Sequence, residues 1–348
     1  MITANDDLDL FANSFDLLKL CGATFVMLSH SFRWFGVEKP FYSLFLTNGS
    51  VGVMMFFTIT GFLIMPAYER QLKQHKHSLL SFYWNRIVRI YPGIFFSFLV
   101  ITLIDMLIIG ENIFSFSFIK YAMKYCIFAR GGGFGEKGLA NGVMWTILPD
   151  IVYYILTPLI WKFFHSAKTS VWIFLISFFW LFNLYDSYTI SLFRKIPIFG
   201  RFVDESFFLC FIYEFLIGSF LYFKRSSIIN YIRRRRWISI WYLVLFTIVS
   251  TYYWYNDSIP QNYLMHSPYM TLLVCPLTIF LAFSFGAIHL KYDFSYGLFL
   301  CHMIVVGVLL WYGVNGFLGV ALTIAITPLL AAVSYFLVER PCRNLKNK

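Results

Sequence analysis

Two ionisable residues, Lys19 and His30, lie in the first apolar segment of the chain, FDLLKLCGATFVMLSHSF. Eleven positions of an α-helix make about three turns and about 16 Å, so both side chains fall on nearly the same face. A charge inside a bilayer costs several kcal/mol, which makes each such residue a candidate for function. The spacing indicates a cation near one end of the helix and a possible general base, His30, near the other. The alternative is that Lys19 reaches the lipid headgroups while His30 hydrogen-bonds to a neighbouring helix.

Arg86 and Arg89 lie three residues apart in the segment FYWNRIVRIYP, so they share a helix face. Two guanidinium groups on one face suit a phosphate-bearing ligand, because each can form forked hydrogen bonds. The alternative is that they anchor the topology of the chain and bind lipid headgroups. A glycine-rich segment follows between Gly131 and Gly138, but it lacks the GK[ST] ending of a phosphate-binding loop. We expect it to be a lid or a tether.

Asp150 lies at the start of a later apolar segment, at the depth expected for His30. A carboxylate beside an imidazole fixes its tautomer and stabilises its cationic form. We therefore expect Asp150 to orient His30 as a base for a hydroxyl nucleophile, although Asp150 could also simply cap its own helix. His302 lies in the middle of another apolar segment, where we expect a packed histidine with one hydrogen bond.

The composition requires a membrane: 59% of the residues are hydrophobic and only 13% are charged. Soluble domains are about a quarter charged, so this chain cannot cover a water-facing surface of its own size. A membrane-spanning helix needs about 20 mostly apolar residues. Ten segments fit, near 15–33, 50–66, 88–109, 148–164, 170–186, 207–223, 237–255, 268–288, 294–312 and 316–337.

With an even number of spans, both termini lie on the same side of the membrane. The loops on that side hold about twice as many Lys and Arg residues as the loops on the opposite side. We therefore predict an all-α integral membrane protein, with about ten transmembrane helices in one bundle and both termini cytoplasmic. Residues 1–348 are expected to form one domain with no fused extracellular domain. The net charge of +11 is explained by this topology and by contact with membrane lipid, so we expect no nucleic-acid partner. The six cysteines show no metal-binding spacing, and no metal is expected.

These residues, in this order, resemble the acyltransferase-3 family of bacterial membrane O-acyltransferases. Further motifs extend the resemblance along the chain: GVMMFFTITGF at 52–62, Trp145-Thr146 with Asp150 and Tyr154, FSYG at 294–297 with His302, and Glu339-Arg340-Pro341. The family often has Arg where this chain has Lys19, and Glu where it has Asp150. The first exchange keeps the charge, and the second shortens the side chain by one carbon.

The resemblance implies that an acetyl group passes from acetyl-coenzyme A to a hydroxyl of a cell-surface glycan or lipid-linked oligosaccharide, such as O-antigen or exopolysaccharide. It implies that His30 is the essential histidine and that Lys19, Arg86 and Arg89 contact the donor. We expect Trp145 and Tyr154 to contact the acceptor, and the protein to reside in the bacterial inner membrane. Two other classes remain open. One is a proton-coupled secondary transporter using Lys19, His30 and Asp150, and the other is a non-catalytic lipid-binding membrane protein.

Overall fold

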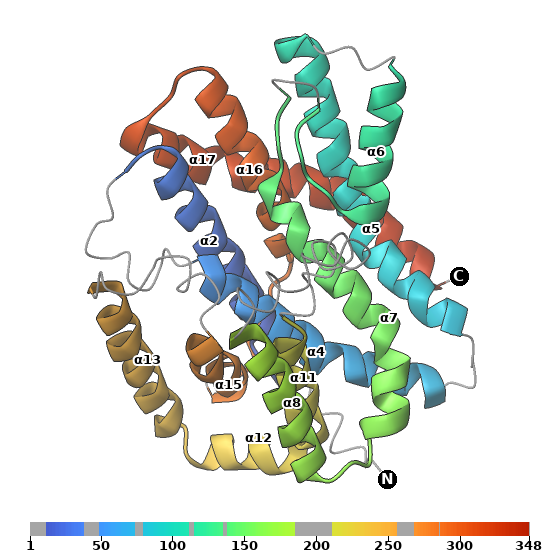
Figure 1. Cartoon of the computed structure of the whole chain (residues 1–348), viewed down its shortest axis with the longest axis vertical. Coiled ribbons are helices and arrows are strands. Elements are labelled where there is room, and N and C mark those ends of the chain that lie inside the picture. The colour runs from blue at the N-terminus through green and yellow to red at the C-terminus, as the bar shows by residue number, and fades with distance from the viewer. Residues whose placement is uncertain are drawn as a thin grey trace, which may run out of the picture. The chain divides into compact units, whose positions relative to one another are not determined.

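A computed structural model describes residues 12–37, 49–73, 79–110, 115–134, 138–184, 211–255, 268–284 and 286–347. Within these ranges the chain is helical and contains no β-strand (Figure 1). The longer helices are α2 (Phe15–Trp34), α4 (Gly49–Lys73), α5 (Leu79–Ile104), α6 (Phe116–Phe128), α7 (Ile147–Phe164), α8 (Thr169–Leu184), α11 (Ile212–Phe223), α12 (Arg225–Arg234), α13 (Trp237–Tyr255), α15 (Pro268–Ser284), α16 (Ser295–Trp311) and α17 (Gly316–Ser334).

Shorter helical turns extend some of these helices. They are η1 (Asp105–Ile109), η2 (Gly142–Thr146), η4 (Tyr335–Glu339), α18 (Arg340–Arg343) and η5 (Asn344–Asn347). A helix occurs within each of the ten apolar segments, although residues 185–186, 207–210 and 285 of those segments lie outside the described residues. The sequence did not predict α6 and α12.

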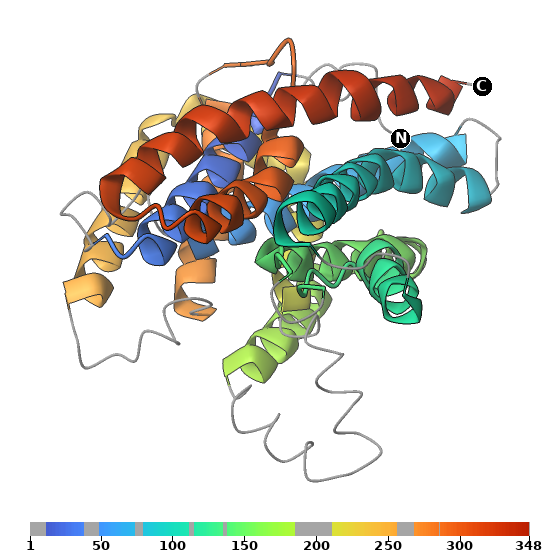
Figure 2. The ribbon, with the colours of Figure 1, turned by 90° about the horizontal axis from the view of Figure 1, so that it is seen from above.

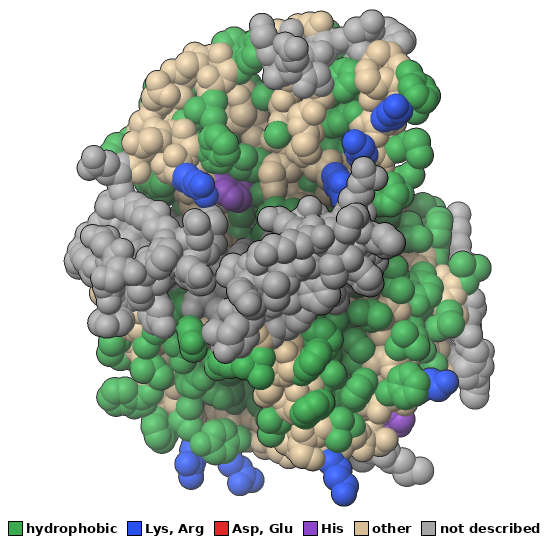
Figure 3. Space-filling view, viewed as in Figure 1, with side chains coloured by type: hydrophobic (Ala, Val, Ile, Leu, Met, Phe, Trp, Pro, Cys, Tyr) green, Lys and Arg blue, Asp and Glu red, His purple; other side chains and the backbone are tan. Residues whose placement is uncertain are grey.

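Four helices in the described part of the chain are long and apolar enough to cross a membrane. They run over Gly49–Lys73, Leu79–Ile108, Gly142–Phe164 and Gly316–Arg343, and five further apolar helices are shorter. Large apolar side chains are exposed on several of these helices, for example Phe174, Leu329 and Leu337. Hydrophobic side chains, in green, cover part of the face shown in Figure 3. Such exposure is expected where side chains face lipid rather than water. The chain is therefore an all-helical membrane protein, and the count of ten spans stays a prediction.

The chain divides into two compact units, and the single domain stays a prediction. The first unit contains Met1–Lys19, Val53–His77 and Pro149–Leu290. Its α11 packs against α8, α15 and α4, and the contact with α4 is so close that a Cβ on Gly61 would overlap the carbonyl oxygen of Phe215. The Ser219 hydroxyl donates to the Gly61 carbonyl across the same contact, at 3.1 Å. Small residues at helix crossings permit this approach of two backbones in a membrane.

The second unit contains Leu20–Gly52, Ser78–Leu148 and Lys291–Lys348. Its α16 and α17 form a helical hairpin, and the two lie side by side in Figures 1 and 2. The turn between them uses Gly313 at φ 73°, a left-handed conformation that favours glycine. A Cβ on Gly297 would lie 3.0 Å from the Ala331 carbonyl oxygen, so the hairpin closes tightly. Most residues of α16 are buried, and α16 also contacts α5.

Candidate active site

His30 and His302 form a hydrogen-bonded pair within the second unit. His30 lies near the end of α2, and His302 lies in the middle of α16. The Nδ1 atom of His30 is 2.9 Å from the Nε2 atom of His302. The two rings are nearly parallel, with an interplanar angle of 13° and centroids 5.2 Å apart. His30 is partly buried, whereas His302 has no exposed surface. The Nδ1 atom of His302 lies 3.2 Å from the Leu298 carbonyl oxygen, so His302 has two hydrogen-bond partners rather than the one expected.

This pairing leaves the Nε2 atom of His30 outside the hydrogen bond between the rings. A neutral imidazole nitrogen in a low-dielectric environment can accept a proton from a hydroxyl group, which is the chemistry of a general base. The sequence predicts that the Asp150 carboxylate lies beside His30 and orients its ring. Asp150 is in the first turn of α7, where a carboxylate is favoured, but it belongs to the first unit whereas His30 belongs to the second. Their pairing stays a prediction.

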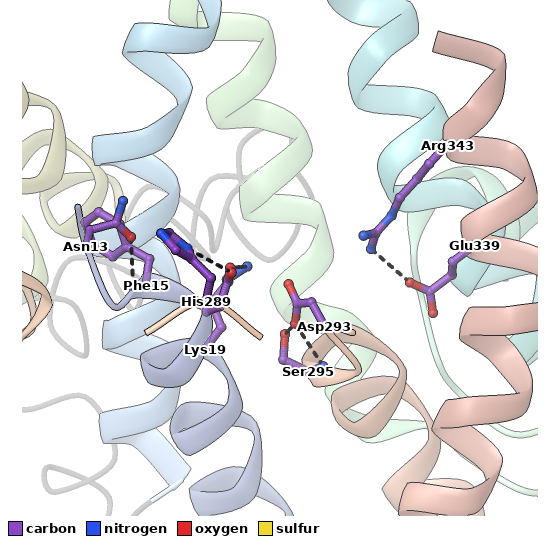
Figure 4. A network of polar contacts seen from close by, with 9 residues as sticks. Asn13, Phe15, Lys19, His289, Asp293, Ser295, Glu339 and Arg343 are labelled. Carbon is purple, nitrogen blue, oxygen red and sulfur yellow. Dashed lines mark hydrogen bonds and ion pairs between the residues drawn. The ribbon is translucent and has the colours of Figure 1, made fainter. Parts of the chain in front are cut away.

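Lys19 forms an ion pair with Asp16, with its Nζ atom 2.9 Å from Asp16 Oδ1. The ring of His289 is near the same carboxylate, with Nδ1 3.8 Å from Asp16 Oδ2 (Figure 4). The partners expected for Lys19 were lipid headgroups or the donor, and Asp16 was not among them. Asp16 lies three positions before Lys19 on one helix, which is the spacing of a helical ion pair and was readable from the sequence.

Arg86 and Arg89 both lie on α5 and are partly buried. The Arg86 guanidinium carbon is 5.5 Å from the centroid of the Phe82 ring. Arg89 forms no hydrogen bond or ion pair with any residue that the structure describes. The C-terminal turns α18 and η5 also contact α5 (Figure 2), and α18 brings Arg340 and Arg343 to this part of the second unit.

Within the Glu339-Arg340-Pro341 motif, the buried Glu339 carboxylate pairs with Arg343, which is partly exposed. Glu339 is 1% exposed, and its carboxylate accepts from the Ser334 hydroxyl at 2.9 Å and from Arg343 at 3.3 Å (Figure 4). In the motif that begins at Phe294, the Asp293 carboxylate accepts from the Ser295 backbone and hydroxyl and so fixes the first turn of α16 (Figure 4). Both motifs hold the framework that carries His302.

The glycine-rich segment before α7 is anchored in its described residues, which favours the tether over the lid. Buried Asn141 donates from Nδ2 to the Tyr125 hydroxyl and to the Leu300 carbonyl, each at 3.0 Å. The Leu139 backbone N–H donates to the Asp105 carboxylate at 3.0 Å. The segment is therefore fixed against α16 two residues before His302. Trp145 follows in η2 and is partly buried in this unit, whereas Tyr154 is buried on α7 in the other unit.

The fold and these residues define a class: a helical membrane protein with a histidine pair inside its helices and two arginines on one helix face. Comparison with known proteins then gives the family. Residues 12–339 match the acyltransferase domain that defines the acyltransferase-3 family, Acyl_transf_3. The chain belongs to this family and is an acyltransferase, as the resemblance implied.

Three curated relatives match the chain, one of them over almost its full length. Nodulation protein 10 of Rhizobium leguminosarum bv. viciae is 25% identical over 367 residues, covering 96% of this chain and 94% of the relative. An O-acetyl transferase of Shigella phage Sf6 is 24% identical over 47% of this chain and 50% of its own length. An uncharacterized protein of Haemophilus influenzae is 30% identical over 36% of this chain and 56% of its own length. No solved structure matches. The comparisons give no support to the transporter alternative.

Proposed function

We propose that this chain is a membrane O-acetyltransferase that moves an acetyl group from acetyl-coenzyme A to a hydroxyl of a cell-surface glycan. The observation that carries the proposal is the His30–His302 pair, which leaves His30 Nε2 available as a base in a chain of the acyltransferase family. The relative from phage Sf6 is named an O-acetyl transferase, which supports acetyl as the group that moves. The acceptor we propose is an O-antigen repeat, an exopolysaccharide or a lipid-linked oligosaccharide at the bacterial inner membrane.

In the proposed reaction, His30 Nε2 takes the proton of the acceptor hydroxyl as its oxygen attacks the thioester carbonyl carbon. A tetrahedral intermediate forms, the carbon–sulfur bond breaks, and the departing thiolate takes the proton back from His30. The products are the O-acetylated glycan and coenzyme A, and the histidine returns to its neutral form.

The other site residues have proposed roles in binding. Arg86 and Arg89 share a face of α5 and would hold the phosphates of the donor by forked hydrogen bonds. Lys19 would contribute positive charge along the donor path while it remains paired with Asp16. Asp150 would orient His30, and Trp145 and Tyr154 would contact the acceptor sugar. A topology of ten spans with both termini cytoplasmic would place the arginines at the cytoplasmic side and His30 toward the outer side.

The decisive experiment compares the O-acetyl content of the surface glycan in native-host cells carrying wild type, His30→Ala, Arg89→Ala or His165→Ala. NMR of the purified polysaccharide measures acetyl groups, and immunoblotting matches the amount of each protein in the membrane. His165 is a control because it is exposed in the turn after α7, and its ring contacts Trp161, with Nδ1 2.8 Å from the Trp161 carbonyl oxygen.

We expect acetylation with wild type and His165→Ala, none with His30→Ala, and a reduced level with Arg89→Ala. In isolated membranes, Arg89→Ala should raise the KM for acetyl-coenzyme A. Full acetylation with His30→Ala would contradict the proposal, and so would glycan that lacks acetyl groups in the wild-type host.

A further inference from the structure

We propose that His302 is a positioning residue: it fixes the tautomer of His30 and so makes Nε2 the nitrogen that accepts the proton. This inference rests on the proposed function, because it concerns the same base. It assigns to His302 a role in the reaction, whereas the sequence indicated only a packed side chain.

The positions of the hydrogens on the two imidazole rings follow from the contact between His302 and the Leu298 carbonyl. A carbonyl oxygen can only accept a hydrogen bond, so the His302 Nδ1 atom, 3.2 Å from the Leu298 carbonyl oxygen, must carry the hydrogen. Leu298 and His302 are one turn apart on α16, so the helix itself holds this contact in place. A neutral imidazole has one N–H group, and the His302 Nε2 atom is therefore left as an acceptor.

The His30 ring must then present a donor to that acceptor. Its Nδ1 atom lies 2.9 Å from His302 Nε2, so Nδ1 of His30 carries the hydrogen and donates it. With Nδ1 protonated, Nε2 of a neutral His30 carries the lone pair. The chain of hydrogen bonds from the Leu298 carbonyl through two imidazoles thus determines which nitrogen of His30 is basic.

Burial keeps His302 in this role. His302 is 0% exposed, and a cationic imidazolium there would lose its hydration without a carboxylate as hydrogen-bond partner in the described residues. His302 therefore serves as a neutral acceptor and keeps its Nδ1–H on Leu298. Its ring is further confined by Phe299, whose ring centroid is 6.1 Å away at an interplanar angle of 65°. Because the side chain is completely buried, close packing limits the rotation of its ring.

The same contact remains useful when His30 takes up a proton. The imidazolium of His30 then carries hydrogens on both nitrogens, and its Nδ1–H still donates to His302 Nε2. A hydrogen bond from a charged donor is stronger than one from a neutral donor, so the contact stabilises the protonated state that forms during transfer. Without an acceptor at position 302, His30 could hold its hydrogen on either nitrogen and would lose this stabilisation.

The test compares three variants on α16 of the full chain in membrane vesicles. His302→Phe keeps a ring of similar size but removes the acceptor, whereas His302→Gln keeps a side-chain oxygen that can accept from His30. Val306→Ala is the packing control: Val306 is also 0% exposed and lies one turn beyond His302. Transfer of labelled acetyl from acetyl-coenzyme A is measured with kcat and KM determined separately and normalised to folded protein.

We expect His302→Phe to lower kcat by about 10²-fold or more, with the KM for acetyl-coenzyme A nearly unchanged, because loss of general-base catalysis costs about 10²- to 10⁴-fold. His302→Gln should retain kcat within about tenfold of wild type, and Val306→Ala should retain it fully. Equal losses in Phe and Gln, or no loss in Phe, would overturn the positioning role while leaving the proposed function intact.

A second measurement reads the tautomer without activity. In ¹⁵N-histidine-labelled protein, the His30 signals, assigned by their loss in His30→Ala, should show a hydrogen on Nδ1 and none on Nε2. His302→Phe should give a mixture of both forms. A hydrogen on Nε2 in the wild type would refute the inference. If the wild type transfers no acetyl, the proposed function fails, and this measurement alone then decides whether His302 sets the tautomer.

Discussion

Replacing Asn141 by Leu should release the glycine-rich segment from α16 at a defined energetic cost. Asn141 is fully buried, and its Nδ2 atom donates to the Tyr125 hydroxyl and the Leu300 carbonyl, each at 3.0 Å. Leu has the same branched shape and number of heavy atoms but no donor, so the substitution removes two hydrogen bonds with little change in side-chain shape. The backbone bond from Asn141 N–H to the Gly131 carbonyl, at 2.6 Å, does not depend on the side chain.

The expected loss of stability depends on which hydrogen bonds the Tyr125 hydroxyl and the Leu300 carbonyl keep in the variant. The Tyr125 hydroxyl keeps its contact with the Ser97 hydroxyl at 3.0 Å, and the Leu300 carbonyl lies inside a helix that supplies a backbone donor. Neither group is therefore left without a partner, and the full desolvation penalty does not apply. Two lost bonds at about 0.5–1.5 kcal/mol each predict that the free energy of unfolding falls by about 1–3 kcal/mol.

The assay is reversible unfolding of the purified protein in mixed micelles, with the free energy extrapolated linearly from the denaturing detergent. Ser117→Ala is the control, because Ser117 is exposed and should change the free energy by less than about 0.5 kcal/mol. In a double-mutant cycle with Tyr125→Phe, the shared bond should appear as a coupling of about 0.5–1.5 kcal/mol. An Asn141→Leu variant as stable as the Ser117→Ala control would refute this account of how the segment is anchored.

Two further substitutions test the packing of the helices and the buried ion pair. Gly61→Ala should lower the free energy of unfolding by about 1–3 kcal/mol or more, because its Cβ would overlap the Phe215 carbonyl oxygen. Gly142→Ala is the control: nothing lies within 4 Å of the added carbon, so it should be tolerated in the same unfolding assay. Arg343→Ala should lower the free energy of unfolding by about 1–3 kcal/mol, because it leaves the Glu339 carboxylate without its cation. The loss is smaller than for a fully buried pair because Arg343 is 32% exposed. Adding Glu339→Gln should restore stability, and failure of that rescue would contradict the ion-pair interpretation.

The helices could be predicted from the sequence because apolar runs of sufficient length can be counted residue by residue. The prediction missed α6 and α12, which do not present a long apolar run. Helix α6 instead begins where the Ser115 hydroxyl accepts from the Phe118 N–H at 3.2 Å, a local cap that hydropathy does not detect. Helix α12 buries only Ile229 and Ile232 and exposes basic residues, so its sequence reads as a charged loop.

The candidate site was predictable where its geometry belongs to one helix. Arg86 and Arg89 share a face of α5 because they are three residues apart, and the Asp16–Lys19 ion pair follows the same spacing. His30 and His302 are 272 positions apart in sequence, and nothing in either segment specifies that α2 and α16 should meet there. Their contact depends on how the helices of the second unit pack, which periodicity alone does not determine.

The distribution of charge in the described helices supports His30 as the group that changes protonation. Acidic side chains in these helices have hydrogen-bond donors or cations beside them: Asp16 pairs with Lys19, Glu69 accepts from the Tyr222 hydroxyl at 2.5 Å, and Glu339 pairs with Arg343. A proton leaving or joining such a pair would expose the remaining charge to a low-dielectric environment, at a cost of several kcal/mol. The histidine pair instead holds no net charge at rest, and its hydrogen bond strengthens when His30 becomes cationic. We therefore expect the histidine pair to take up and release a proton within one reaction cycle, while the ion pairs of the described helices keep their charges.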